Sequence, residues 1–143
     1  MSFLPTDEEY RNLLHSKELY KQIFDSSVLP IIIHDMYLNI IEVNDKVIEV
    51  FGYSKEEILD LKILDLHTHN ELEHSLEVLE KMQESDRLTV KTEFKRKDGS
   101  IITAEVSPCK IKLKNTAFIH VHINNIKDLE EVETETEELL NKK

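Results

Sequence analysis

The chain reads Leu88-Thr-Val-Lys-Thr-Glu-Phe-Lys-Arg-Lys-Asp-Gly-Ser-Ile-Ile-Thr-Ala-Glu-Val106 in its second half, where apolar and polar residues alternate on both sides of Asp98-Gly99. Alternation with a period of two predicts half-buried strands, and Asp-Gly favours a tight hairpin turn between them. A third strand is predicted at 117–126, after a short lysine-rich loop. Three consecutive antiparallel strands are therefore expected in this half of the chain.

A second hairpin is predicted upstream. Residues 30–33 and 40–43 are β-branched runs, and Asp35-Met-Tyr-Leu-Asn39 separates them. β-Branched residues are enriched in strands, and a short segment that joins two such runs favours a hairpin. The two hairpins and the strand at 117–126 give five strands in total.

Helix signals precede the first strand. Thr6-Asp-Glu-Glu9 has the form of a capping box, in which the Thr6 hydroxyl and the Glu9 carboxylate satisfy free backbone N–H groups. Ser16 offers a second cap, and apolar residues recur at helical spacing until Asp25. The front of the chain is therefore expected to form two short helices or one interrupted helix.

Between the two hairpins the pattern is helical. Asn44 can cap a short helix at 45–51, which Gly52 would end in the left-handed conformation. Ser54-Lys-Glu-Glu57 is another capping box, and residues 63–66 suit one more helical turn. The longest core helix is expected after Asn70, with its apolar stripe at Leu72, Leu76, Leu79 and Met82.

The last residues differ in composition from the rest. Residues 127–143 are acidic and helix-prone, with Leu129, Val132, Thr136 and Leu139 at three-four-three spacing. The predicted fold class is thus α+β, with an antiparallel sheet interrupted by helices. The predicted organisation is a flanking helix at 1–17, a central domain at 18–127 and a linker helix at 128–143 that forms a coiled-coil stub.

Composition limits the class of function. The 143 residues carry a formal net charge of −11, which argues against nucleic acid as the main partner because phosphate repels an acidic surface. No apolar run approaches the about 20 residues of a membrane helix, and the start lacks the form of a signal peptide. With one cysteine, Cys109, a reducing cytoplasmic setting is expected.

The sequence contains no enzyme motif that we recognise. With only Gly52 and Gly99, it cannot build a glycine-rich phosphate loop, and no paired carboxylates point to acid–base catalysis. Cys109 is interpreted as a small buried residue. His120 and His122 share a strand face and could chelate a metal, but no third ligand is evident, so we interpret them as surface histidines and expect no metal.

The order of elements and several short strings resemble a PAS domain of the sensory-box type. The strings are spread over residues 18–127: Ile40-Ile-Glu-Val-Asn44, Phe51-Gly-Tyr-Ser-Lys-Glu-Glu-Ile58, Leu64-Asp-Leu-His67, Phe94-Lys-Arg-Lys-Asp-Gly-Ser100, Ala104-Glu-Val-Ser-Pro108 and Asn124-Asn-Ile-Lys127. The resemblance implies a five-stranded antiparallel sheet, with short helices between strands 2 and 3, that encloses a pocket and serves to sense or relay a signal.

Two positions depart from the family's pattern. The family's first hairpin turns on Asp-x-x-Gly, and here Asn39 is expected to take the left-handed conformation in place of glycine. Asn125 replaces the aspartate that usually precedes Ile126, so the resemblance does not carry over the family's salt bridge at the exit of the sheet.

The family's pattern, combined with alternation along the strands, assigns pocket residues. His120 and His122 would then lie on the outer face of the sheet. Such a pocket would be apolar, and either its own side chains fill it or a small apolar or weakly polar ligand does. The expected lining residues are Ile33, Asn44, Val90, Phe94, Ala104, Ile119, Val121 and Ile123.

Two cofactors known from relatives can be weighed against this sequence. Light-sensing relatives hold flavin beside a cysteine in an Asn-Cys-Arg string, and Cys109 lies on the wrong element, so flavin is disfavoured. A haem-binding branch of the family places its proximal histidine on the long helix. His74 lies at a similar distance along the chain after the leucine-rich turn. No arginine among the pocket-facing residues could steady bound oxygen, so haem is the less favoured alternative.

The linker suggests how such a module would signal. Ile126 leads directly into Leu129 and Val132, so a shift of the last strand would move the following helix. A homodimer is expected through Tyr10, Leu13 and Leu14, helped by the outer sheet face with His120 and His122. By analogy the chain would be the input part of a longer protein such as a histidine kinase, and a ligand-free dimerisation module is the alternative.

Overall fold

The computed structural model describes residues 6–68, 77, 80–81 and 89–129. Most of the predicted long helix after Asn70, with the haem candidate His74, lies outside these residues, as does most of the predicted linker helix, with Val132.

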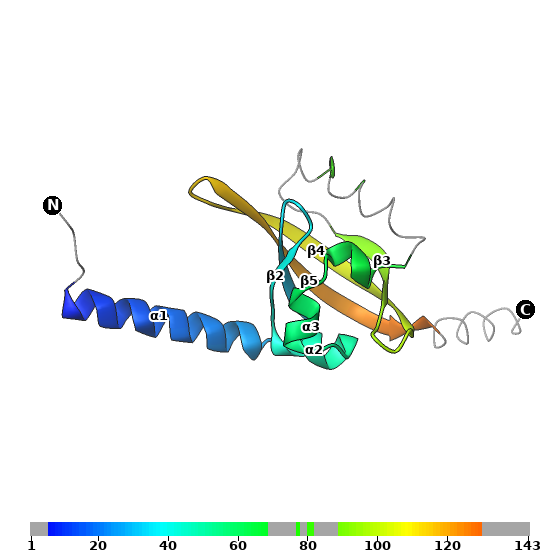
Figure 1. The fold of residues 1–143 in the computed structure, drawn as a ribbon, viewed down its shortest axis with the longest axis horizontal. Coiled ribbons are helices and arrows are strands. Elements are labelled where there is room, and N and C mark those ends of the chain that lie inside the picture. The colour runs from blue at the N-terminus through cyan, green and yellow to red at the C-terminus, as the bar shows by residue number, and fades with distance from the viewer. Residues whose placement is uncertain (1–5, 69–76, 78–79, 82–88, 130–143) are drawn as a thin grey trace, which may run out of the picture.

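Five strands form one antiparallel sheet in the order β2-β1-β5-β4-β3, which places the last strand in the middle (Figure 1). Every neighbouring pair is antiparallel. The α+β class and the five-stranded sheet predicted from the sequence are therefore confirmed. The strands are β1 (Ile31–Asp35), β2 (Ile40–Val43), β3 (Val90–Lys95), β4 (Ile101–Leu113) and β5 (Thr116–Asp128).

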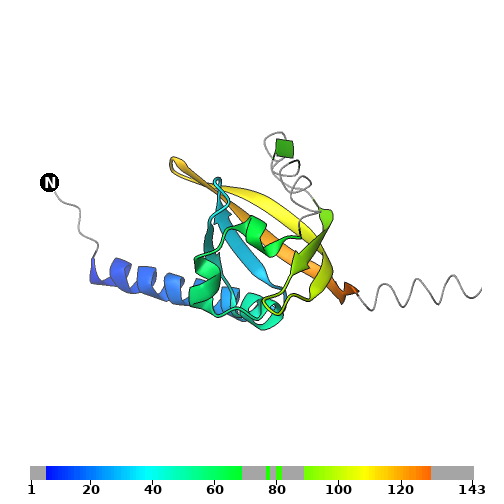
Figure 2. The same ribbon diagram turned by 45° about the vertical axis from the view of Figure 1, so that its right-hand side comes forward.

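The helices occupy two different places. α2 (Asp45–Phe51), α3 (Lys55–Leu59) and the 3₁₀ turn η1 (Ile63–Leu66) connect β2 toward β3 and cover one face of the sheet, whereas α1 (Asp7–Asp25) projects away from it (Figures 1 and 2). We call the helix-covered face the inner face and the opposite one the outer face. The apolar core lies between the inner face and these short helices.

The prediction of two short helices, or one interrupted helix, at the front of the chain was wrong. α1 is one continuous helix, and the capping box at Thr6 and Glu9 is present at its start. Ser16 lies inside the helix, because one serine among good helix formers costs too little to break it. The flanking helix therefore extends past the predicted boundary at residue 17.

The predicted caps of the short helices are confirmed. The Asn44 side chain accepts from the backbone N–H of Val47, and Gly52 ends α2 with a φ of 83°. The Ser54 hydroxyl and the Glu57 carboxylate form the capping box of α3. A salt bridge of 2.8 Å from Lys97 to Glu57 lowers the pKa of the Glu57 carboxyl to about 2 and ties α3 to the β3–β4 turn.

The turn between β1 and β2 differs from expectation. Leu38, not Asn39, takes the left-handed conformation, with a φ of 73°. Asn39 instead donates its backbone N–H and its side-chain amide to the Asp35 carboxylate, at 2.9 and 3.1 Å. The carboxylate thus fixes the turn, and the left-handed position moves one residue earlier.

β4 begins where predicted and ends later, and β5 is longer than predicted at both ends. Their pairing extends to Leu113 opposite Thr116, beyond the other three strands, and β5 continues past Ile126 to Asp128. β3 begins opposite Val106, so β4 is an edge strand beyond that point, where Pro108 is tolerated.

Candidate functional site

The inner face of the sheet is the first candidate site, because most predicted pocket residues lie there. Val90 is half-buried and packs against the same core. The sequence prediction thus placed these side chains on the correct face, and contact with a ligand stays a prediction. The buried residues of this set are Phe94, Ala104, Ile119, Val121 and Ile123.

Ile33 was wrongly assigned to the pocket. It lies opposite His120 in the β1–β5 pairing, and directly opposed residues share a face, so Ile33 is on the outer face. Ile32 and His34 take the inward positions and are 0% and 5% exposed. Three consecutive isoleucines give no alternation signal, so the sequence alone could not fix which of them points inward.

Asn44 lies in the core, but its amide serves the backbone and has no capacity left for a ligand. Its Oδ1 accepts from the N–H groups of Ile31 and Val47, at 3.0 and 3.2 Å. Its Nδ2 donates to the carbonyls of Phe24 and Leu29, both at 3.0 Å. Two acceptor sites and two donors are thereby used. Asn44 joins the end of α1, the start of β1 and the start of α2.

His34 is a buried titratable residue that the sequence analysis did not single out. Burial lowers the pKa of its imidazole, and its Nδ1 lies 2.8 Å from the carbonyl oxygen of Asp35. The neutral ring donates from Nδ1 to that carbonyl, which leaves Nε2 as an acceptor. His34 and Thr92 are the buried polar side chains that β1 and β3 add to the inner face within the described residues.

Aromatic contacts join η1 and α2 to β3. The Phe94 ring lies 5.4 Å from the Phe51 ring, edge to face, and 4.7 Å from the His67 ring, measured between centroids. His67 Nδ1 also lies 3.1 Å from the carbonyl oxygen of Ile63. Phe94 is therefore the side chain through which the short helices contact the edge strand.

The exit of β5 is the second candidate site, and a bulge shapes it. Glu105 pairs with Asn124 while Thr103 pairs with Lys127, so β5 has one residue more than β4 in this interval. Asn125 has a φ of 50°, and its amide donates to Glu105 at 3.0 Å. The extra residue turns Ile126 to the inner face, where it packs against the core.

A salt bridge closes this exit. Arg96, in the β3–β4 turn, donates from Nη1 to Asp128 at 2.6 Å and from Nε to the carbonyl oxygen of Val50 at 3.0 Å. The same Nη1 lies 3.2 Å from the Ser100 hydroxyl. One guanidinium thus connects the end of β5 to α2 and to the β3–β4 turn. Asp128 was missed in the sequence because the family's pattern places the carboxylate at position 125.

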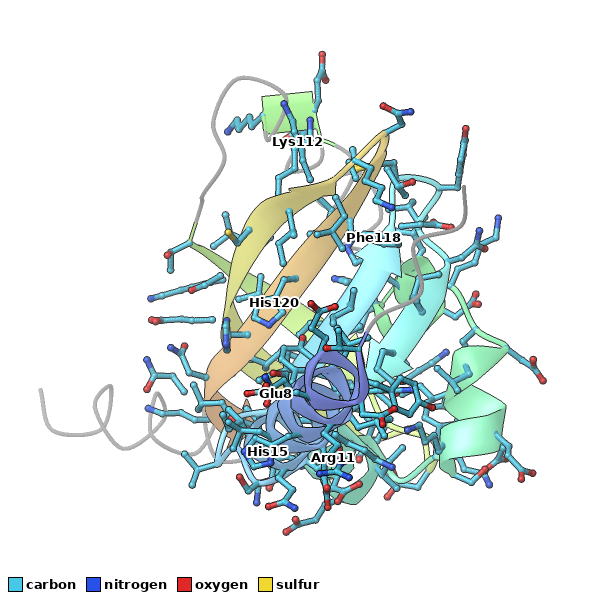
Figure 3. All side chains as sticks on the ribbon, turned by 90° about the vertical axis from the view of Figure 1, so that its left-hand side faces the viewer. Glu8, Arg11, His15, Lys112, Phe118 and His120 are labelled. Carbon is cyan, nitrogen blue, oxygen red and sulfur yellow. The ribbon has the colours of Figure 1, made fainter. Side chains whose placement is uncertain are left out.

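The predicted dimer residues are accessible. Tyr10, Leu13 and Leu14 are 54%, 68% and 50% exposed on α1. Figure 3 looks along α1 toward the sheet and shows Phe118 and His120 on β5, beyond the helix. The alternation of burial along β5 confirms that His120 and His122 lie on the outer face.

A family model described as "PAS domain" matches residues 28–131, which is most of the chain. The chain belongs to the PAS domain family. The resemblance inferred from the sequence is thus confirmed, and the exit salt bridge of this PAS domain is formed by Asp128, three residues after the substituted position Asn125.

Solved structures confirm the PAS fold. A PAS domain from a two-component sensor histidine kinase aligns with a TM-score of 0.72 and 18% identity, over 80% of this chain and 99% of that one. The PAS domain of an HTR-like protein from Haloarcula marismortui aligns with a TM-score of 0.69 and 20% identity, over 87% of this chain and 100% of that one. The LOV protein of Rhodobacter sphaeroides aligns with a TM-score of 0.63 and 15% identity, over 76% of this chain and 67% of that one.

Two findings are negative. No curated protein matches this PAS domain in sequence. Within the described residues, no helix combines the length and the apolar character needed to cross a membrane.

Proposed function

We propose that this PAS domain is the signal-sensing and relay module of a cytoplasmic signal-transduction protein, and that β5 transmits changes in the core or in a dimer contact to the segment after Asp128. The observation that carries the proposal is the position of β5. It is the central strand, it contributes inward side chains to the core, and it ends in the Arg96–Asp128 salt bridge.

The route along β5 is continuous. Ile119, Val121 and Ile123 contribute to the core, and Ile126 continues the same inner face after the bulge. Two residues later the Asp128 carboxylate accepts a hydrogen bond from Arg96, and Leu129, the last described residue, is helical. Because a packed strand moves as a unit, a shift of the core side chains displaces Asp128 relative to Arg96.

The salt bridge is suited to be a switchable contact. The Arg96 side chain is 26% exposed and the Asp128 side chain 48%, so water competes for both partners. Such a pair contributes about 1 kcal/mol or less to stability, which small changes in the core can offset. Loss of the pair frees the end of β5 without unfolding the sheet.

The core is proposed to hold a small apolar ligand or none, and the module is proposed not to be an enzyme. Among the described residues, the buried side chains of the core are apolar apart from His34, Asn44 and Thr92. Flavin is disfavoured because Cys109 lies on β4, half-buried, outside the core. An absorption spectrum of the purified chain without flavin or Soret bands is expected, and a Soret band lost in His74→Ala would contradict this proposal.

The proposed output partner is a histidine kinase. The support is that this fold has been solved in a PAS domain from a two-component sensor histidine kinase and in a domain of the sensory box sensor histidine kinase/response regulator from Geobacter sulfurreducens. Fold similarity at this identity is an analogy, so the partner requires a functional test.

The test joins the 143-residue chain to the catalytic core of a histidine kinase and compares two matched substitutions. Asp128→Asn removes the exit salt bridge, and Glu49→Gln removes the surface pair that Lys46 makes with Glu49 at 3.2 Å. Autophosphorylation is expected to change at least about fivefold in Asp128→Asn and to stay unchanged in Glu49→Gln. Equal activity in both variants and the parent contradicts the relay.

A further inference from the structure

Two histidines on the outer face of β5 stand in contact. The rings of His120 and His122 have centroids 4.4 Å apart and planes at 80° to one another. Both side chains project from the same face of a rigid central strand, as residues two apart do. The sheet therefore fixes the backbone from which both side chains project.

The strand register adds a third donor that the sequence could not reveal. Cys109 on β4 lies directly opposite His120, and Ser107 lies opposite His122. Directly opposed residues have Cβ atoms about 5 Å apart, which a metal bound to one thiolate and one imidazole can bridge. Cys109 is a free thiol and is half-buried.

The thiol is not yet turned toward the imidazoles. Its Sγ lies 3.9 Å from the carbonyl oxygen of Lys110. In the described part of the chain, no three side chains of histidine, cysteine, aspartate or glutamate already stand close enough to hold a metal ion. To bind one ion together, the thiol must rotate about its Cα–Cβ bond and the two adjacent imidazoles must each turn a ring nitrogen toward it.

An unsatisfied polar atom lies next along the same row. Within the part of the chain that the structure describes, the Oδ1 of Asn124 is buried and has no hydrogen-bond partner. Asn124 is two residues after His122 and before the bulge, so it shares the outer face. A buried acceptor without a partner is rare and requires an explanation. A ring N–H of a metal-bound histidine, or a metal-bound water, would supply the missing donor.

We propose that His120, His122 and Cys109 bind a divalent transition-metal ion of the zinc class on the outer face of the sheet. On binding, the Cys109 thiol forms a metal–sulfur bond and releases its proton to solvent, while each imidazole binds through one neutral ring nitrogen. A water occupies the fourth position of the tetrahedron. Asn124 Oδ1 accepts a hydrogen bond at this site and orients the ligands.

The donor set selects the class of metal. Imidazole and thiolate suit Zn²⁺, Co²⁺ and related ions, whereas Ca²⁺ and Mg²⁺ require oxygen ligands. The chain's net charge of −11 favours cations in general, so an excess of Mg²⁺ must be present in any test. The site uses neither the inner face nor the exit salt bridge, although it lies on β5, the strand of the proposed relay.

The test titrates Co²⁺ and Zn²⁺ into the metal-free 143-residue chain in excess Mg²⁺. One ion per chain is expected, and Co²⁺ should give the charge-transfer absorption of a cobalt–thiolate bond. Cys109→Ser removes that band, His122→Gln weakens Zn²⁺ binding more than about 100-fold, and Asn124→Ala weakens it about tenfold. His15→Gln, on exposed α1, is the matched control and leaves both readouts unchanged.

Three results would overturn the proposal. Zn²⁺ affinity that His122→Gln does not change would place the ion elsewhere. Co²⁺ binding without the thiolate band would exclude Cys109. One ion per two chains would indicate a bridge between copies instead of a site within one chain. Circular dichroism of each variant confirms that the comparison is between folded proteins.

Discussion

Asn44 shows how much one side chain contributes to this fold. Its amide makes four buried or partly buried hydrogen bonds to backbone groups from four segments. The sequence predicted the helix cap correctly, because capping is a local interaction with Val47. The three other bonds involve residues 13 to 20 positions away, and no local pattern predicts them.

Replacing Asn44 with alanine is expected to lower the free energy of unfolding by at least about 3 kcal/mol, because it leaves several buried backbone groups without partners. Asn44→Asp is also expected to destabilise the domain, since it keeps the acceptors but loses both donors to Phe24 and Leu29. Urea unfolding measures both changes.

The matched control is Asn115→Ala, at the exposed turn between β4 and β5. It should change stability by less than about 0.5 kcal/mol. A loss in Asn44→Ala no larger than that of the control would show that the buried network does not hold these segments together.

The buried imidazole of His34 is expected to make the stability of the domain depend on pH. Burial lowers the pKa of its imidazole below the ordinary value of 6.5, so the unfolded chain binds a proton more readily than the folded one. The contribution of the neutral His34 ring to the free energy of unfolding is complete above pH 6.5. It is lost as the pH falls from 6.5 through the lower pKa of the folded state. The free energy of unfolding of the parent chain should therefore decrease between pH 7 and pH 5.

His34→Leu should reduce that slope, whereas His15→Leu, at an exposed position on α1, should leave it as in the parent chain. Urea unfolding at half-unit pH steps measures the three slopes. Parallel curves for all three proteins would exclude His34 as a source of the acid sensitivity.

At the scale of elements, the predictions succeeded where the signal was local. Both hairpins, the caps of α2 and α3, and the turn at η1 followed from period, capping pattern and turn residues. The β-bulges could not be predicted from such local patterns. Ile40 and Val43 both point inward, and Asn125 adds one residue to β5, because cross-strand pairing, which no local residue pattern specifies, sets these irregularities.

The bulge of β5 is expected to require a residue that tolerates a positive φ. Asn125→Val places a β-branched side chain at a φ of 50° and should lower the free energy of unfolding by about 1–3 kcal/mol. Asn125→Gly is the control, since glycine adopts this conformation without strain. Equal free energies of unfolding in urea for the valine and glycine variants would contradict the positive φ at this position.

At the scale of the whole molecule, α1 leaves a large apolar surface uncovered within the described structure. Leu13, Leu14 and Tyr20 are each at least 50% exposed on a helix that projects from the domain (Figure 1). Exposed apolar stripes of this kind mark interaction surfaces. This supports the predicted homodimer, whose geometry depends on a second copy and cannot follow from one sequence.

Leu13→Glu combined with Leu14→Glu is therefore expected to convert the dimer to monomer in light scattering at micromolar concentration. Tyr37→Glu, at a turn residue that is 80% exposed, should leave the mass unchanged. A monomeric parent chain, or a double variant that stays dimeric, would remove α1 from the dimer contact.

The proposed relay requires that Arg96 and Asp128 hold the end of β5 against α2 and the β3–β4 turn. Amide hydrogen exchange of the 143-residue chain, read by mass spectrometry, tests this requirement by comparing Asp128→Asn with Glu49→Gln. Faster exchange is expected at residues 124–129 in Asp128→Asn alone, with α1 unchanged. Identical exchange in the two variants, or a uniform increase over the whole chain, would contradict the relay.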